Sequence, residues 1–191
     1  MRIAVIITCY NRKNKTVKCI ECLKKQFDKS DIVYDIHLTD DGCTDGTSDA
    51  VKEIFPNVII YKGENLFWAG GMRLAWKGAY EKGGYNYFLF LNDDTFVNDN
   101  LVEDFYECCL YDSNPTIITG ACYDSKRGMR SYTGTIIMNK FFKRRFVDVI
   151  GCPQYIDLSG ANAMFIPKEI VDNVGFFPSV YVHGIADYDY C

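Results

Sequence analysis

Short apolar runs alternate with longer segments of helical periodicity in the first half of the chain. Three of these runs are rich in β-branched residues and predict strands at residues 3–8, 33–38 and 58–61. The fourth run, at residues 88–91, has four large apolar residues in succession. A strand with one wet face would alternate apolar with polar residues, so this run predicts a strand buried on both faces.

Between these runs, apolar residues recur every three or four positions, as they do on one face of an α-helix. The expected helices cover residues 15–27, 48–55 and 72–80. Pro56 ends the second of them, and Gly83 and Gly84 end the third. Strand therefore alternates with helix four times within 94 residues. This order predicts an α/β fold with a doubly wound, largely parallel sheet.

The second half of the chain has shorter elements. We expect helices at residues 101–110 and 168–174 and a strand at 116–121. Residues 131–138 and 146–150 should form shorter antiparallel elements. The basic run at 143–145 is interpreted as a solvated turn. The small residues that begin at Ser159 would let a ligand lie close to the backbone, although tight packing against a helix would also select them.

Polar loops follow three of the predicted strands, at residues 9–12, 39–47 and 92–95. Because ligands bind at the carboxyl ends of parallel strands, we expect these loops to share one site. The adjacent carboxylates of Asp93 and Asp94 repel each other unless a cation lies beside them. Asn92 and Asp94 also have a spacing and oxygen chemistry that suit Mg²⁺ or Mn²⁺. A solvated turn is the alternative interpretation.

Composition adds limits on location and partners. The 191 residues are 48% hydrophobic and carry a formal net charge of −4, which gives no electrostatic basis for nucleic-acid binding. The nine cysteines and the start of the chain, which lacks the pattern of a secretory signal, predict reduced thiols and a cytoplasmic location. The single Cys-x-x-Cys pair, Cys19 and Cys22, is weak evidence for zinc. No window is apolar enough for a spanning helix, so we expect at most peripheral contact with the inner face of the membrane.

Two common phosphate-binding patterns are missing from the sequence. Neither the P-loop pattern nor Gly-x-Gly-x-x-Gly follows a predicted strand. The three polar loops can instead divide a nucleotide diphosphate among them. An amide and an aromatic ring can hold the base, carboxylates can accept base N–H or ribose hydroxyl groups, and a metal ion can bridge the phosphates.

Four motifs occur in order along the chain: Thr8-Cys9-Tyr10-Asn11-Arg12, Asp40-Asp41-Gly42-Cys43-Thr44-Asp45-Gly46-Thr47, Leu91-Asn92-Asp93-Asp94 and Ala186-Asp187-Tyr188-Asp189. Together they resemble family 2 glycosyltransferases of the GT-A fold, and within that family the bacterial rhamnosyltransferase-like branch that builds cell-surface polysaccharides. The resemblance covers essentially the whole chain. It implies a mostly parallel mixed sheet flanked by helices, and one catalytic domain over 1–191. Residues 1–100 would be the nucleotide-binding half, and 101–191 a donor-sugar and acceptor half truncated at its C-terminus.

The resemblance also implies an activity: inverting transfer of a hexose-type sugar from a UDP- or dTDP-linked donor to a hydroxyl of a lipid-linked or polysaccharide acceptor. The residues implied to contact the nucleotide are Thr8, Tyr10, Asn11, Arg12, Asp41 and Asp93. Those implied to line the donor pocket are Trp68, Gly71, Gly160 and Ala161. Asp94 would bind Mg²⁺ or Mn²⁺, with Asn92 standing where an aspartate is common and His183 either a further ligand or a structural residue.

Inversion requires a general base that deprotonates the acceptor hydroxyl. Asp187 is the candidate, because it occupies the second place of the family's Glu-Asp motif, with Ala186 in the first. Asp189 is either its partner or a residue that begins a helix. Two other functions stay open. One is a sugar nucleotidyltransferase, although such enzymes have a basic glycine-rich loop after the first strand and residues 9–12 match it poorly. The other is a non-catalytic nucleotide-sugar binding module. Binding without transfer would identify the module.

Overall fold

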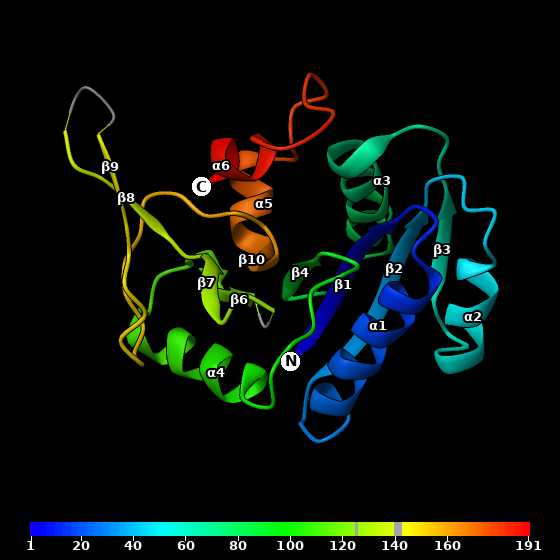
Figure 1. Cartoon of the computed structure of the whole chain (residues 1–191), viewed down its shortest axis with the longest axis horizontal. Coiled ribbons are helices and arrows are strands. Elements are labelled where there is room, and N and C mark those ends of the chain that lie inside the picture. The colour runs from blue at the N-terminus through cyan, green and yellow to red at the C-terminus, as the bar shows by residue number, and fades with distance from the viewer. Residues whose placement is uncertain (125, 140–142) are drawn as a thin grey trace.

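The computed structural model describes residues 1–124, 126–139 and 143–191, and its centre is a six-stranded sheet (Figure 1). The strands are β1 (Arg2–Cys9), β2 (Val33–Asp40), β3 (Ile59–Lys62), β4 (Tyr87–Leu91), β5 (Ile118–Thr119) and β10 (Ala163–Pro167), in the order β3-β2-β1-β4-β10-β5. Strands β1 to β4 are parallel, and β10 is antiparallel to both β4 and β5. The predicted mostly parallel mixed sheet is confirmed.

Helices cover both faces of this sheet (Figure 1). They are α1 (Lys13–Phe27), α2 (Thr47–Ile54), α3 (Phe67–Lys82), α4 (Leu101–Tyr111), α5 (Lys168–Val174) and α6 (Ala186–Tyr190). Helices α1, α2 and α4 pack on the face to which Val5 of β1 points, whereas α3, α5 and α6 pack on the face of Ile6. Because both faces are covered, β1 and β4 have no polar alternation.

The hydrophobic core on the Ile6 face of the sheet is built around Trp76 of α3, which is fully buried. Its ring lies edge-on to Phe90 of β4 at a centroid distance of 4.8 Å and to Tyr190 of α6 at 5.4 Å. Aromatic pairs in this geometry contribute about 0.5–1.5 kcal/mol each beyond the area that they bury. These contacts attach α6, which was not predicted, to the same face as α3. They thereby place Asp187 of α6 near the end of β4.

Beyond α4, several predicted boundaries were wrong. The strand expected at 116–121 is reduced to β5, and the element expected at 131–138 is two strands that belong to different hairpins. One hairpin pairs β6 (Cys122–Asp124) with β7 (Met129–Tyr132), and the other pairs β8 (Thr135–Ile137) with β9 (Arg144–Phe146). The break falls near Gly134, where a Cβ would lie 2.4 Å from Ile156.

The strand expected at 146–150 was also misplaced, because β9 ends at Phe146. Two residues of the basic run, Arg144 and Arg145, therefore belong to a strand instead of the expected turn, and residues 140–142 lie outside the described residues. Among the described residues, no helix has both the length and the apolar character that crossing a bilayer requires.

Candidate functional site

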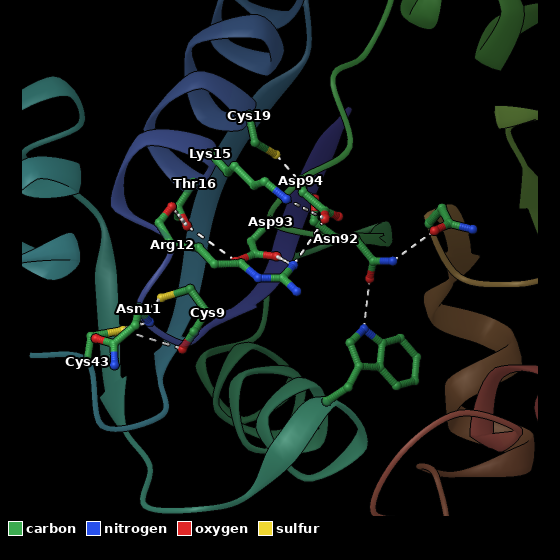
Figure 2. A network of polar contacts seen from close by, with 12 residues as sticks. Cys9, Asn11, Arg12, Lys15, Thr16, Cys19, Cys43, Asn92, Asp93 and Asp94 are labelled. Carbon is green, nitrogen blue, oxygen red and sulfur yellow. Dashed lines mark hydrogen bonds and ion pairs between the residues drawn. The ribbon is translucent and has the colours of Figure 1, made fainter. Parts of the chain in front are cut away.

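Arg12 joins the loops that follow β1 and β4 (Figure 2). Its Nη1 atom lies 3.1 Å from Oδ1 of Asp93 and 3.0 Å from Oδ2 of Asp94, and Nζ of Lys15 lies 3.5 Å from the same Asp94 oxygen. The positive charge that two adjacent carboxylates need is thus present in the chain itself. As expected, these two loops lie at the same edge of the sheet, and Arg12 therefore contacts Asp94.

The two carboxylates have different surroundings. The side chain of Asp93 is 8% exposed, whereas that of Asp94 is 37% exposed. Burial raises the pKa of Asp93, with a smaller contribution from the charge of Asp94, while Arg12 and a hydrogen bond from Thr16 act in the opposite direction. Asp94 is therefore the member of the pair that is more accessible to a ligand from solvent.

Asp41 connects the loop after β2 to the beginning of α3. Its Oδ1 atom accepts a hydrogen bond of 2.8 Å from the backbone N–H of Leu66, and its Oδ2 atom accepts one of 2.9 Å from Phe67. The free N–H groups at a helix N-terminus favour a carboxylate in this position. Asp41 is buried, and an ionised carboxylate has about four acceptor sites, so its oxygens can still accept a further hydrogen bond from a ligand.

Asn11 joins the loop after β1 to the loop after β2. Its Oδ1 atom accepts hydrogen bonds from the backbone N–H of Thr44 at 2.8 Å and from the Thr44 hydroxyl at 3.3 Å. Asn11 has a φ of 49°, in the left-handed region that asparagine tolerates. The neighbouring ring of Tyr10 is 59% exposed, so an amide and an open aromatic ring lie side by side at this end of the site.

Asn92, which follows β4, forms side-chain hydrogen bonds with both Trp68 and Asn162 (Figure 2). Its Oδ1 atom accepts a 2.7 Å hydrogen bond from the indole N–H of Trp68, and its Nδ2 atom donates one of 2.9 Å to Oδ1 of Asn162. The two asparagines also share a backbone hydrogen bond of 3.1 Å. Asn162 was missed in the sequence, where its only signal was its place within the run of small residues.

An open cavity of about 270 Å³ lies beside this chain of hydrogen bonds. Its lining includes Trp68, Asn92, Gly160, Asn162, Asp187 and Tyr188. Asp187 is held at the cavity by two backbone N–H groups: Oδ2 accepts from Ala161 at 2.9 Å and Oδ1 from Tyr188 at 3.0 Å. Elements that are far apart in the sequence therefore bring a fixed carboxylate and an indole ring to one cavity.

Other predicted residues lie away from that cavity lining. Gly71 packs against β1, where a Cβ would lie only 2.2 Å from the hydroxyl oxygen of Thr8, and its carbonyl accepts a 2.7 Å hydrogen bond from Thr39. The ring of His183 contacts that of Phe67 at a centroid distance of 4.5 Å. For Gly71, close packing of α3 on the sheet accounts for the lack of a side chain.

Within the part of the chain that the structure describes, no three His, Cys, Asp or Glu side chains lie together as a metal site. Mg²⁺ sites commonly have only one or two protein carboxylates and take their other ligands from water and substrate phosphates. The exposed Asp94 carboxylate fits that kind of site. Asn92 fits it less well, because its oxygen already accepts the Trp68 N–H.

A comparison with family models gave one match that covers most of the chain. The model described as Glycosyl transferase family 2 matches residues 4–170. This range contains the loops after β1, β2 and β4, the Trp68 segment and the run of small residues before β10. It ends before α6. A search of the curated proteins found no match.

Solved structures with the same fold cover the chain from end to end. The structure of S. aureus TarS 1–349 has a TM-score of 0.66 and 16% identity, and the match covers 100% of this chain and 54% of TarS 1–349. Mannosyltransferase PcManGT from Pyrobaculum calidifontis, in complex with GDP-Man and Mn²⁺, has a TM-score of 0.62 and 15% identity, covering 98% of this chain and 50% of that one. At these identities the likeness establishes the fold, and the chain spans about half the length of these proteins.

Proposed function

Since the chain belongs to glycosyl transferase family 2 and has the GT-A fold, we propose that it transfers a sugar from a nucleotide-diphosphate donor to an acceptor hydroxyl, with inversion at the anomeric carbon. The proposal is based on the arrangement of residues at one edge of the sheet. There the Arg12, Asp93 and Asp94 cluster lies next to a cavity that contains Asp187. Residues 1–100 would bind the nucleotide, and residues 101–191 would complete the donor-sugar and acceptor side.

The nucleotide would bind over the loops after β1 and β2. The exposed Tyr10 ring can stack on a base, and the remaining acceptor capacity of Asp41 suits a base N–H. Asn11 holds these two loops together, Thr8 lies in β1 just before the first of them, and Arg12 lies at the end of that loop. Asp93, which is buried against Arg12, would act on the ribose or donor-sugar side.

The diphosphate would lie at the exposed side of Asp94. Arg12 and Lys15 are already there, and both can form charge-assisted hydrogen bonds with phosphate oxygens. A bound Mg²⁺ or Mn²⁺ would neutralise charge on the leaving diphosphate. Asp94 would hold that cation. The mannosyltransferase of the same fold, which was solved with Mn²⁺, supports the use of a divalent cation. Asn92 and His183 stay predictions as ligands.

The sugar would occupy the cavity between Trp68 and Asp187. The indole N–H of Trp68 is used by Asn92, which fixes the plane of its ring at the cavity. Gly160 has no side chain and leaves that space open. Ala161 does not line the cavity: its side chain is buried in the core, and its backbone N–H donates to Asp187. Asp187 is oriented by two backbone N–H groups and would take the proton from the acceptor hydroxyl as that oxygen attacks the anomeric carbon.

Titration of nucleotides tests this proposal most directly. We expect the chain to bind UDP or dTDP more tightly than GDP, and to do so with the help of Mn²⁺. TarS has been solved in complex with UDP and the mannosyltransferase in complex with GDP-Man, so the titration includes both of these bases and adds thymine as the third. Absence of binding to all three nucleotides, in a sample with a cooperative unfolding transition, would reject the donor site.

The acceptor follows from the rhamnosyltransferase-like resemblance. We propose a lipid-linked or polysaccharide hydroxyl acceptor in cell-surface glycan synthesis, reached from the cytoplasmic face of the membrane. The alternative is a module that binds nucleotide sugars without transferring them. Release of free sugar or glycosylated acceptor from a bound donor supports the enzyme. Tight donor binding with no release over many hours supports the module.

Asn162→Ala tests the sugar cavity. The variant removes the acceptor of the Asn92 Nδ2 hydrogen bond, so Asn92 and Trp68 lose part of their fixed orientation. We expect the dissociation constant of the nucleotide sugar to rise by about tenfold, which corresponds to about 1.4 kcal/mol, with little change for the free nucleotide. Isothermal titration with both ligands measures the difference. Asn162→Asp, which keeps an acceptor oxygen, should restore most of the lost affinity, and equal weakening of both ligands would contradict a role in the sugar cavity.

A further inference from the structure

Two of the nine free cysteines are in contact at the edge of the candidate site (Figure 2). Cys9 is the last residue of β1, and Cys43 lies in the loop after β2. Their Sγ atoms are 3.8 Å apart. We propose that Cys9 and Cys43 form a thiol modification site, at which a low-molecular-weight disulfide such as oxidised glutathione converts the pair reversibly into a disulfide.

The positions of both residues favour closure. In the parallel register of β1 and β2, Cys9 lies opposite Asp40, whose carboxylate accepts a 2.7 Å hydrogen bond from the backbone N–H of Cys43. A disulfide has an S–S length of about 2.0 Å, so the sulfur atoms must approach by about 1.8 Å. Cys43 follows Gly42, which has a φ of 91° and no atom within 4 Å of where a Cβ would lie. Closure requires the Cys43 sulfur to give up its contact with the backbone N–H of Asn11 at 3.3 Å, on a loop that is open to solvent at Gly42.

The two thiols have different access to solvent, which assigns the order of the reaction. Cys9 is 3% exposed, whereas Cys43 is partly exposed. Cys43 would lose its proton to solvent and attack one sulfur of oxidised glutathione, releasing one glutathione thiolate. Cys9 would then lose its proton and attack Sγ of Cys43, releasing the second glutathione. The protein gives up two electrons and two protons, and oxidised glutathione is reduced to two molecules of glutathione.

The rate of this reaction should depend on pH. Burial raises the pKa of both thiols, most strongly that of Cys9, where the nearby Cys43 and the carboxylates of Asp40 and Asp93 act in the same direction. Asp40 also raises the pKa of Cys43, whereas the backbone N–H of Asn11 lowers it. Since the thiolate is the nucleophile, oxidation should be slow at pH 7 and accelerate toward pH 9. The pair would therefore stay reduced under mild conditions and respond to sustained exposure to disulfides.

Peptide mapping tests the site without reference to nucleotide binding. Cleavage after Lys and Arg places Cys9 in the peptide 3–12 and Cys43 in the peptide 30–52, and each peptide contains a single cysteine. After incubation with oxidised glutathione at pH 8.5 and alkylation of the remaining thiols, we expect a cross-linked 3–12/30–52 species that disappears on reduction. Cys43→Ser should abolish it, whereas the Cys108→Ser, Cys109→Ser double variant should not. Alkylated or singly glutathionylated 3–12 and 30–52 peptides without the cross-link would overturn the proposal.

A second measurement concerns the consequence for the site, and this step rests on the proposed function. Closing the disulfide moves the loop that Asn11 binds through Thr44, next to Tyr10 and Asp41. We expect nucleotide affinity to fall by about tenfold on oxidation, to recover on reduction, and to be insensitive to oxidant in Cys43→Ser. Equal affinities of the oxidised and reduced protein would reject this effect. If the reduced protein binds no nucleotide, the proposed function fails while the peptide map still decides whether the disulfide forms.

Discussion

Replacing Asp187 with asparagine is expected to lower the rate constant for sugar transfer by about a thousandfold, within the range of about 10²–10⁴ that a general base contributes. Asparagine has almost the same shape and keeps one oxygen for the backbone N–H of Ala161, but it cannot take a proton from a hydroxyl. The dissociation constant for the nucleotide should therefore change by less than about twofold, because the interaction lost is made only in the transition state. Transfer rates at saturating donor, together with nucleotide titration, measure the two effects separately.

Asp189→Asn is the matched control for this experiment. Asp189 lies on the same short helix, but its side chain is exposed and does not line the cavity. The same substitution there should leave transfer within about twofold of the wild type, as expected for a group that does not act in the transition state. A comparable loss in both variants would indicate that α6 as a whole has been disturbed. Full activity of Asp187→Asn would exclude Asp187 as the base.

The sequence was most informative where burial alone determines the residues. Residues 88–91 have no polar alternation because β4 lies between β1 and β10 and is covered on both faces. Once β1, β2 and β4 were expected to be parallel, the shared edge of their polar loops followed from the geometry of parallel sheets. The contact between Arg12 and Asp94, which are 82 positions apart, is the result.

Specific side-chain partners could not be predicted in the same way. The pairing of Asn92 with Asn162 depends on β10 returning antiparallel beside β4, and neither asparagine has a local pattern that indicates a partner 70 positions away. The spacing of Asn92 and Asp94 suggested a metal ion, yet the structure shows that Trp68 already donates to the Asn92 oxygen. The hairpins after α4 were hard to locate because their side chains, such as those of Arg144 and Phe146, are exposed and carry no periodic signal.

Arg12 and Lys15 would compete with a divalent metal ion for the carboxylate of Asp94. In this structure their side chains neutralise the carboxylate pair, and they would exchange these contacts for phosphate oxygens when a nucleotide binds with a divalent cation. The carboxylate of Asp94 would then bind the metal ion instead of Arg12 and Lys15. Because the side chains of Arg12 and Lys15 are 48% and 57% exposed, these ion pairs contribute only about 0–1 kcal/mol to stability and can be exchanged at low cost.

Asp94→Ala should therefore separate metal binding from folding. We expect Mn²⁺ to strengthen nucleotide binding in the wild type and to have no effect in the variant, while transfer falls by about 10²–10³-fold, the range seen when one electrostatic stabiliser of a transition state is lost. Binding without metal should be equal to that of the wild type or tighter, because Arg12 and Lys15 are released to the diphosphate. Titration with and without Mn²⁺ gives both values.

The control for Asp94→Ala is Asp99→Ala. Asp99 also forms an ion pair with a lysine of α1, Lys25, at 3.0 Å. Its side chain is 73% exposed and does not take part in the Arg12 cluster. Asp94→Ala should keep its free energy of unfolding within about 1 kcal/mol of the wild type, as expected for exposed ion pairs. Asp99→Ala also removes the acceptor of a 2.8 Å hydrogen bond from the buried Gln26 side chain, so its loss should be about 1–2 kcal/mol. Only Asp94→Ala should lose the response to Mn²⁺. If the response persists in Asp94→Ala, the cation is held by other groups, and the carboxylate pair serves Arg12 and Lys15 rather than a metal ion.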